Sequence, residues 1–165
     1  MKLKIIIKRG KDLAILALGT RVGSALKVAD HLLQDNLKIT VADARFAKPI
    51  DTELLEKLWN EHQKLIIIEE GSAGGFSSHC LHILSSKDLL NKHDKEIKCL
   101  TMPDNFQDHA SQNEQLAKAG LDTDGLMKVV SEMISLSNTN NKTIANNQVS
   151  NVNLPFAMTR SAYPF

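Results

Sequence analysis

Three charged side chains that could recognise an anion lie close together in the chain: Asp43, Arg45 and Lys48. The planar guanidinium of Arg45 is suited to a carboxylate or a phosphate. We expect Arg45 to form a structural ion pair with Glu69 or Glu70, which end another expected strand. A substrate anion and a contact with another domain are the alternatives for this arginine.

A second group of candidates combines two carboxylates with glycines. Glu69 and Glu70 are followed by Gly71, Gly74 and Gly75, just before a segment with helical spacing. Glycines before a helix can expose backbone N–H groups that bind phosphate. The two carboxylates oppose an anion at this place, and the spacing matches neither the P-loop nor the G-x-G-x-x-G pattern. We therefore interpret the glycines as positions that need close packing or positive φ.

Histidines are the remaining candidates for metal binding and acid–base chemistry. On a helix, His79 and His82 would share a face, whereas Cys80 would point about 100° away, so a complete metal site is not expected. His109, beside Asp108, could act as an acid or a base, but no nucleophile accompanies it. The residues alone therefore predict no catalytic set, no cofactor-binding set and no metal site.

The elements that must position these residues follow from the hydrophobic pattern. Apolar runs of strand length alternate with segments of helical spacing, which predicts a mostly parallel sheet in a three-layer α/β/α sandwich. The expected strands cover residues 3–9, 13–18, 39–43, 65–70 and 97–102. The helix after Gly19 is expected to bury Val22, Ala25, Leu26, Ala29, Leu32 and Leu33, and the helix from Thr52 to bury Leu54, Leu55, Leu58 and Trp59.

A rigid corner is predicted between the strand at 39–43 and the helix from Thr52. Pro49 restricts the backbone of Lys48, Asp51 is placed to cap the helix, and Ile50 with Leu55 fits a hydrophobic staple. Ligands of open α/β sheets bind outside the carboxyl ends of the strands. We therefore expect four segments to meet at one edge of the sheet: residues 19–21, 43–48, 69–75 and 102–109.

Composition limits the function classes. The formal net charge of +1 gives no electrostatic reason to expect nucleic acid or a membrane surface as partner. The sequence contains no signal-peptide pattern and no apolar run long enough to span a membrane. We interpret Cys80 and Cys99 as buried free thiols, and we therefore expect a cytoplasmic protein. We predict one α/β domain at residues 1–136 and a flexible, asparagine-rich tail at 137–165.

Three blocks of sequence resemble a known family. Residues 43–51, DARFAKPID, resemble the signature of the C-terminal domain of transketolase-like, thiamine-diphosphate-dependent enzymes. Residues 65–79 are similar to the next strand and loop of 1-deoxy-D-xylulose-5-phosphate synthase. So are residues 102–106 with Asp108 and His109, followed by 115–117 and 119–122. The resemblance runs from about residue 3 to residue 136. The sequence departs from the family pattern at Ala110, and its asparagine-rich tail has no counterpart in that pattern.

The resemblance implies a five-stranded sheet whose first strand is antiparallel to the others. It also implies a homodimeric enzyme that condenses pyruvate with glyceraldehyde 3-phosphate on thiamine diphosphate and Mg²⁺, at the start of isoprenoid precursor synthesis. The cofactor and the catalytic residues would belong to the N-terminal and central domains, on which this domain packs. The chain alone is then inactive, and its structural or interface candidates are Asp43, Arg45, Lys48, Pro49, Asp51, Glu69, Glu70, Gly74, Gly75 and His109.

Two kinds of alternative remain open. The same domain could belong to another thiamine enzyme, such as transketolase or the beta subunit of a 2-oxo acid dehydrogenase. A free-standing α/β module that binds a small molecule at the charged edge is the alternative from another class. A phospho-receiver is disfavoured because Gly19 and Thr20, not an acidic pair, follow the strand at residues 13–18.

Overall fold

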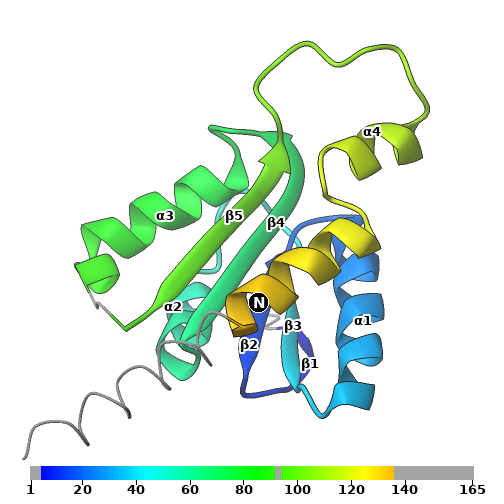
Figure 1. Ribbon diagram of the computed structural model, residues 1–165. Coiled ribbons are helices and arrows are strands. Elements are labelled where there is room, and N and C mark those ends of the chain that lie inside the picture. The colour runs from blue at the N-terminus through cyan, green and yellow to red at the C-terminus, as the bar shows by residue number, and fades with distance from the viewer. Residues whose placement is uncertain (1–4, 92–93, 136–165) are drawn as a thin grey trace, which may run out of the picture. The chain divides into compact units, whose positions relative to one another are not determined.

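The structure is a computed structural model that describes residues 5–91 and 94–135 (Figure 1). The strands are β1 (Ile5–Lys8), β2 (Leu13–Ala17), β3 (Ile39–Asp43), β4 (Lys64–Ser72) and β5 (Glu96–Met102). The helices are α1 (Arg21–Leu32), α2 (Thr52–Glu61), α3 (Phe76–Ser86) and α4 (Gln112–Lys118), with short 3-10 turns at Leu33–Asp35 and Leu89–Asn91. A further helix covers residues 123–135. The compact unit described below extends to Met133.

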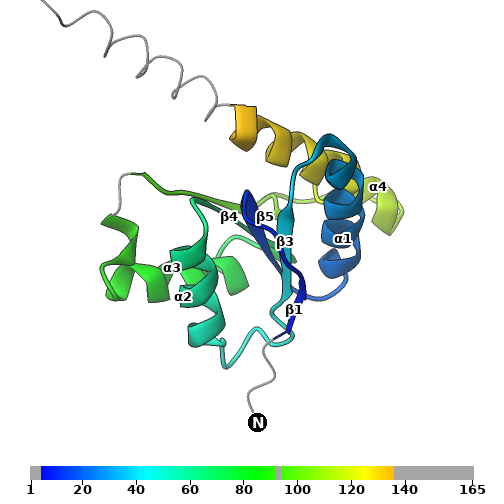
Figure 2. The same ribbon diagram turned by 90° about the horizontal axis from the view of Figure 1, so that it is seen from below.

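The strands form a five-stranded sheet in the order β1-β3-β2-β4-β5. β1 is antiparallel to β3, and all other pairs are parallel. Helices α2 and α3 cover one face of the sheet, and α1 lies on the other (Figure 2). The predicted α/β/α sandwich with an antiparallel first strand is confirmed.

The centre of the sheet forms the core. Every residue of β2 is buried, and so are residues 65–68 of β4. A strand that is apolar on both faces cannot alternate with polar residues, which is why these runs are continuous in the sequence. β5 lies at one edge of the sheet and is only half-buried along its length.

Helix α2 begins at the predicted residue and has the predicted cap and buried residues. Asp51 Oδ1 accepts a hydrogen bond from the Leu54 N–H at 2.9 Å, which caps the helix. The helix buries Leu54, Leu55, Leu58 and Trp59. Ile50 packs against the same core cluster.

The buried stripe of α1 differs from the prediction. Its buried residues are Arg21, Ala25, Val28, Ala29 and Leu32. Val22 and Leu26 are only half-buried, and Leu33 is 47% exposed in the 3-10 turn that follows. The helix therefore turns the arginine inward, where it has polar partners, and the apolar pattern alone did not include a charged residue in the stripe.

Two further predictions concern the termini and the membrane. None of the helices in residues 5–91 and 94–135 has the length and hydropathy needed to cross a bilayer. The predicted flexible tail at 137–165 lies outside the described residues.

Candidate functional site

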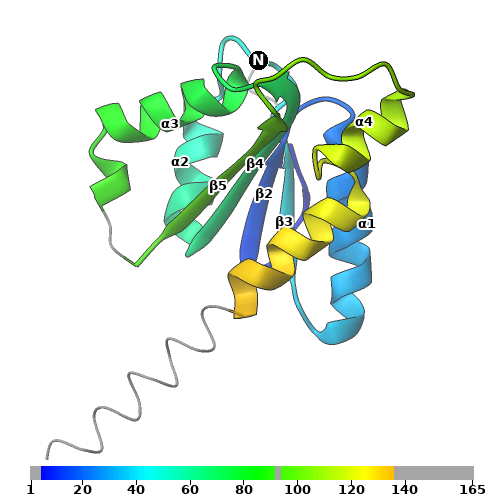
Figure 3. The ribbon, with the colours of Figure 1, turned by 45° about the horizontal axis from the view of Figure 1, so that its top comes forward.

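The carboxyl ends of the parallel strands meet at one edge, as predicted. Ala17 at the end of β2 pairs with Asp43 in β3 and with Ile68 in β4, and Ser72 of β4 pairs with Met102 of β5. The loops that follow these strands leave the same side of the sheet (Figure 3). This edge carries every charged candidate from the sequence except the histidines of α3.

Glu69 occupies the amino end of α3. The residue is 3% exposed, and its carboxylate accepts hydrogen bonds from the Phe76 N–H at 3.0 Å, the Ser77 N–H at 2.7 Å and the Ser77 hydroxyl at 2.8 Å. A helix amino end attracts negative charge because its first N–H groups have no partner within the helix. Here the protein supplies that negative charge itself, so the position of an anionic ligand is already filled.

The glycines of this loop make room for the Glu69 carboxylate. A Cβ at Gly75 would lie 2.6 Å from Glu69 Oε2, and one at Gly71 would lie 2.7 Å from the same oxygen. Gly74 adopts φ +96°, which side chains rarely allow. Close packing and positive φ therefore both occur in the loop, at different glycines.

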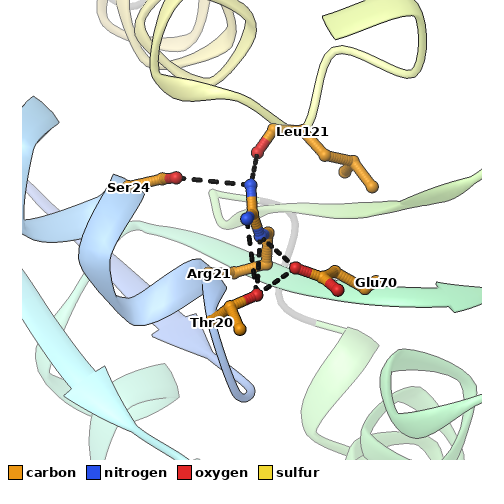
Figure 4. A network of polar contacts seen from close by, with 5 residues as sticks. All are labelled: Thr20, Arg21, Ser24, Glu70 and Leu121. Carbon is orange, nitrogen blue, oxygen red and sulfur yellow. Dashed lines mark hydrogen bonds and ion pairs between the residues drawn. The ribbon is translucent and has the colours of Figure 1, made fainter. Parts of the chain in front are cut away.

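Arg21 forms the buried ion pair of the edge (Figure 4). Its Nε lies 3.0 Å from Glu70 Oε1, and its Nη1 donates to the Leu121 carbonyl at 2.6 Å. The Thr20 hydroxyl donates to the same oxygen of Glu70. The arginine side chain is 9% exposed and that of Glu70 is 34% exposed. The network ties the start of α1 to the end of β4 and to the loop after α4.

The predicted ion pair of Arg45 is wrong. Arg45 is exposed, and within the described part of the chain it pairs with neither Glu69 nor Glu70. Glu69 is turned inward to cap α3, and Glu70 is taken by Arg21. Sequence reasoning placed residues 19–21 at this edge but gave Arg21 no role, although its position four residues before Ala25 and eight before Ala29 places it on the buried stripe.

Arg45 is held in a strained turn. Its φ is +59°, and the Phe46 N–H donates to the Ala44 carbonyl at 2.7 Å, which defines a γ-turn of the rare positive-φ kind. The Arg45 N–H donates to Asp43 Oδ1 at 2.8 Å. The turn directs exposed side chains outward, including Phe46 at 66% exposure. The Lys48–Pro49 peptide bond that follows is cis.

A hollow of about 700 Å³ lies beside this turn. It is lined by residues 43–46 and 48–54, which belong to the segment from the end of β3 to the first turn of α2 that we call the β3–α2 corner (residues 43–54). Apolar side chains of Phe46, Pro49, Ile50 and Leu54 contribute to the lining. The hollow is thus built by the segment that carries the sequence signature.

The histidine and cysteine candidates take no part in the hydrogen bonds and ion pairs described above. His79 is half-buried and His82 exposed on α3, and His109 is exposed in the loop after β5. No three His, Cys, Asp or Glu residues of the described ranges are grouped so that they could hold a metal ion. Burial raises the pKa of the Cys80 thiol to about 12, and Cys99 and Glu69 add to the effect, so Cys80 is not a nucleophile at neutral pH.

Comparison with known proteins gives the family. Residues 2–126 match the family described as transketolase, C-terminal domain. Among solved structures, a split gene transketolase, described as an inactive beta4 tetramer, is 27% identical with a TM-score of 0.70. The similarity covers 81% of this chain and 43% of that one.

Two more distant structures share the fold. One is 2-oxoglutarate:ferredoxin oxidoreductase from Magnetococcus marinus with 2-oxoglutarate, coenzyme A and succinyl-CoA bound, at 14% identity, a TM-score of 0.52, and coverage of 81% of this chain and 20% of that one. The other is transketolase from Campylobacter jejuni subsp. jejuni NCTC 11168, at 17% identity, a TM-score of 0.51, and coverage of 78% and 18%. The chain thus spans less than half the length of each of these three solved structures. Because the family match covers most of its 165 residues, the chain belongs to the family of transketolase C-terminal domains.

Proposed function

We propose that this chain is the C-terminal domain of a 1-deoxy-D-xylulose-5-phosphate synthase. That enzyme condenses pyruvate with glyceraldehyde 3-phosphate, with loss of carbon dioxide, at the entry to isoprenoid precursor synthesis. Family membership supports the thiamine-enzyme assignment. The blocks at residues 65–79 and 102–122 support the synthase over transketolase and over the beta subunit of a 2-oxo acid dehydrogenase.

The role proposed for the domain is to support the catalytic domains and organise the homodimer, without chemistry of its own. The observation that carries this role is the position of Glu69. The glycine-rich start of α3, at the carboxyl edge of the sheet, is occupied by the protein's own buried carboxylate. Arg21, the buried cation of the edge, is likewise satisfied by Glu70 and by the Leu121 carbonyl.

The position of the Glu69 carboxylate argues against a diphosphate group at the start of α3. A diphosphate would meet the Glu69 carboxylate at the amino end of α3, where like charges repel. The proposal therefore assigns the cofactor, the metal and the catalytic residues to the N-terminal and central domains. It also assigns the enzyme to the cytoplasm, where the thiols of Cys80 and Cys99 stay reduced.

Immunodepletion tests the assignment. An antibody against this chain should remove from an extract of the expressing cells the activity that forms 1-deoxy-D-xylulose 5-phosphate from pyruvate and glyceraldehyde 3-phosphate. Transketolase and 2-oxo acid dehydrogenase activities should remain in the same extract and serve as internal controls. Loss of either control activity instead, with the synthase activity retained, would contradict the proposal.

Calorimetry on the purified chain tests the supporting role. Titration with thiamine diphosphate in the presence of Mg²⁺ should give only the heat of dilution. A saturable heat that requires Mg²⁺ and corresponds to a micromolar Kd would show that this domain holds the cofactor itself.

A further inference from the structure

We infer that His62 and Thr40 form a pH-sensitive hydrogen-bond switch that joins the turn between β1 and β2 (residues 9–12) to the end of α2. While the His62 ring is neutral, the Thr40 hydroxyl donates to the ring. When the ring is protonated, the hydroxyl turns to the Gly10 carbonyl. The switch lies at the amino edge of the sheet, opposite the edge described above, and it makes no use of the proposed function.

His62 is a buried titratable side chain that the candidate site does not use. It is 5% exposed and directly follows the last residue of α2. Its Nδ1 lies 3.0 Å from the Leu58 carbonyl oxygen. Its Nε2 lies 2.8 Å from Thr40 Oγ1 and 3.3 Å from the Gly10 carbonyl oxygen. Both ring nitrogens therefore face oxygens of the protein, and Thr40 is itself 3% exposed.

The Leu58 carbonyl fixes one proton of the ring. A carbonyl oxygen can only accept a hydrogen bond, so His62 Nδ1 carries a proton in the neutral and in the protonated ring. In the neutral ring, Nε2 then has no proton and needs a donor. The Thr40 hydroxyl, at 2.8 Å, is that donor. The contacts therefore select the Nδ1–H tautomer of neutral His62.

Two acceptors compete for the single hydroxyl proton of Thr40. Besides the ring, Thr40 Oγ1 contacts the Gly10 carbonyl oxygen at 2.8 Å, and it accepts a hydrogen bond from the Gly10 N–H at 2.9 Å. A hydroxyl oxygen has two lone pairs. When Nε2 gains a proton, Nε2–H donates to the second lone pair of Oγ1, and the hydroxyl proton turns to the Gly10 carbonyl. Each charge state of the ring therefore has its own satisfied arrangement.

The turn at Gly10 is packed tightly, so the switch moves protons and not the backbone. A Cβ at Gly10 would lie 2.1 Å from the Lys38 carbonyl oxygen. The N–H groups of Lys11 and Asp12 donate to the same carbonyl at 3.0 and 3.1 Å. Because these contacts fix the Gly10 backbone beside Thr40, rotation of the hydroxyl is sufficient to change its acceptor.

Charged groups of both signs surround His62. In α2, the hydrogen bond from Lys57 lowers the pKa of Glu61, and His62 and Arg9 add smaller effects. Lys95, just before β5, donates to the His62 carbonyl at 2.8 Å. The other charged residues of the adjoining segments are Lys11, Asp12, Lys38, Lys64 and Glu96. Within the described ranges His62 forms no ion pair, so hydrogen bonds to neutral oxygens place its protons.

NMR of the purified chain, labelled with ¹⁵N and ¹³C, tests the neutral state. At about pH 8, His62 should give the ring signals of the Nδ1–H tautomer. Exposed His82 is the internal control and should give the Nε2–H tautomer, which water favours. Thr40→Val should move the Nε2 resonance of His62 toward that of a nitrogen without a donor. Thr40→Ser keeps the hydroxyl and should leave this resonance close to wild type.

The same spectra at about pH 5 test the protonated state, because histidine side chains change their charge between about pH 5 and pH 8. On acidification, the Gly10 carbonyl carbon of the wild-type chain should shift downfield, since its oxygen gains the Thr40 hydroxyl as a donor. Thr40→Val should lose most of this shift, and Thr40→Ser should retain it. The backbone amide spectrum establishes that both variants are folded.

Four results would overturn the inference. The first is an Nε2–H tautomer of neutral His62, because Nδ1 would then have no proton for the Leu58 carbonyl. The second is a His62 ring signal that does not change between the two pH values. The others are an Nε2 resonance unaffected by Thr40→Val and equal Gly10 shifts in Thr40→Val and wild type. The first two are measured on the wild-type chain, so the test does not depend on the folding of a variant.

Discussion

Two arginines at the carboxyl edge of the sheet differ in how the fold uses them. Arg21 is buried and contacts Glu70, Ser24 and the Leu121 carbonyl, so it joins three segments that are distant in the sequence. Arg45 is exposed on a strained turn and has no ion pair in the described ranges. The arginine that stabilises the fold is therefore Arg21, which lies outside the family signature at residues 43–51, and not Arg45, which lies within it.

This difference predicts unequal effects of alanine substitution on the free energy of unfolding. Arg21→Ala should lower it by about 2–3 kcal/mol, somewhat less than for a fully buried pair because Glu70 is one-third exposed. Arg45→Ala should lower it by less than about 1 kcal/mol, since alanine at the same positive φ retains the strain and no buried partner is lost. Urea denaturation measures both values, and equal losses would contradict the assignment of the two roles.

At the element scale, α3 depends on a residue of the preceding strand. Glu69 ends the buried part of β4 and caps α3 through two backbone N–H groups. Because the carboxylate must reach back over the loop, the loop backbone lies against it. Gly71 and Gly75 are therefore a consequence of this cap and not a separate phosphate-binding device.

Two glycine-to-alanine substitutions test the packing of this element. Gly75→Ala should destabilise the protein by about 2 kcal/mol, because its Cβ would lie 2.6 Å from Glu69 Oε2 and 3.1 Å from the Ser72 carbonyl oxygen. Gly23→Ala is the control inside α1, where the added methyl meets nothing within 4 Å. It should stabilise the protein by about 0.5–1 kcal/mol through a higher helix propensity. Thermal and urea unfolding should show opposite signs for the two variants, and the same sign would refute this account of the loop.

At the scale of the whole molecule, one core cluster joins the sheet to α2 and α3. It includes residues of β2 and β4 together with Leu55, Trp59 and Cys80. Cys80 is fully buried, and its raised pKa keeps the thiol protonated in the folded protein. The unfolded chain loses this proton near the ordinary pKa of 9.0, so ionisation of Cys80 favours unfolding above that pH.

The pH dependence of unfolding should report this burial. Between pH 8 and pH 10, Cys80 should lower the free energy of unfolding by about 1 kcal/mol, because the unfolded state binds fewer protons than the folded state in this window. Burial lowers the pKa of Lys64, which acts in the opposite direction, so the difference between wild type and Cys80→Ala isolates the cysteine. The variant should be less stable at pH 8 but should lose less stability with rising pH. Parallel curves for the two proteins would contradict the burial of the thiol.

The local sequence was sufficient to predict the strands of the sheet and helix α2. Continuous apolar runs identified β2 and β4 because a strand covered on both faces has no polar side. The contacts of Asp51 and the four buried residues of α2 lie within a few positions of one another, so helical spacing alone defines them. Antiparallel pairing of β1 came from the family resemblance, since no local pattern gives the direction of a partner strand.

The sequence by itself determined the order of strands and helices, the family, and the edge at which the charged residues meet. Tertiary structure decided which charges pair there. Glu69 and Glu70 are neighbours in a strand, and successive side chains of a strand point to opposite faces. One therefore caps α3 on one face and the other meets Arg21 of α1, which leaves Arg45 exposed beside Phe46. Such pairing depends on distances between elements, and these are fixed only when the layers pack together.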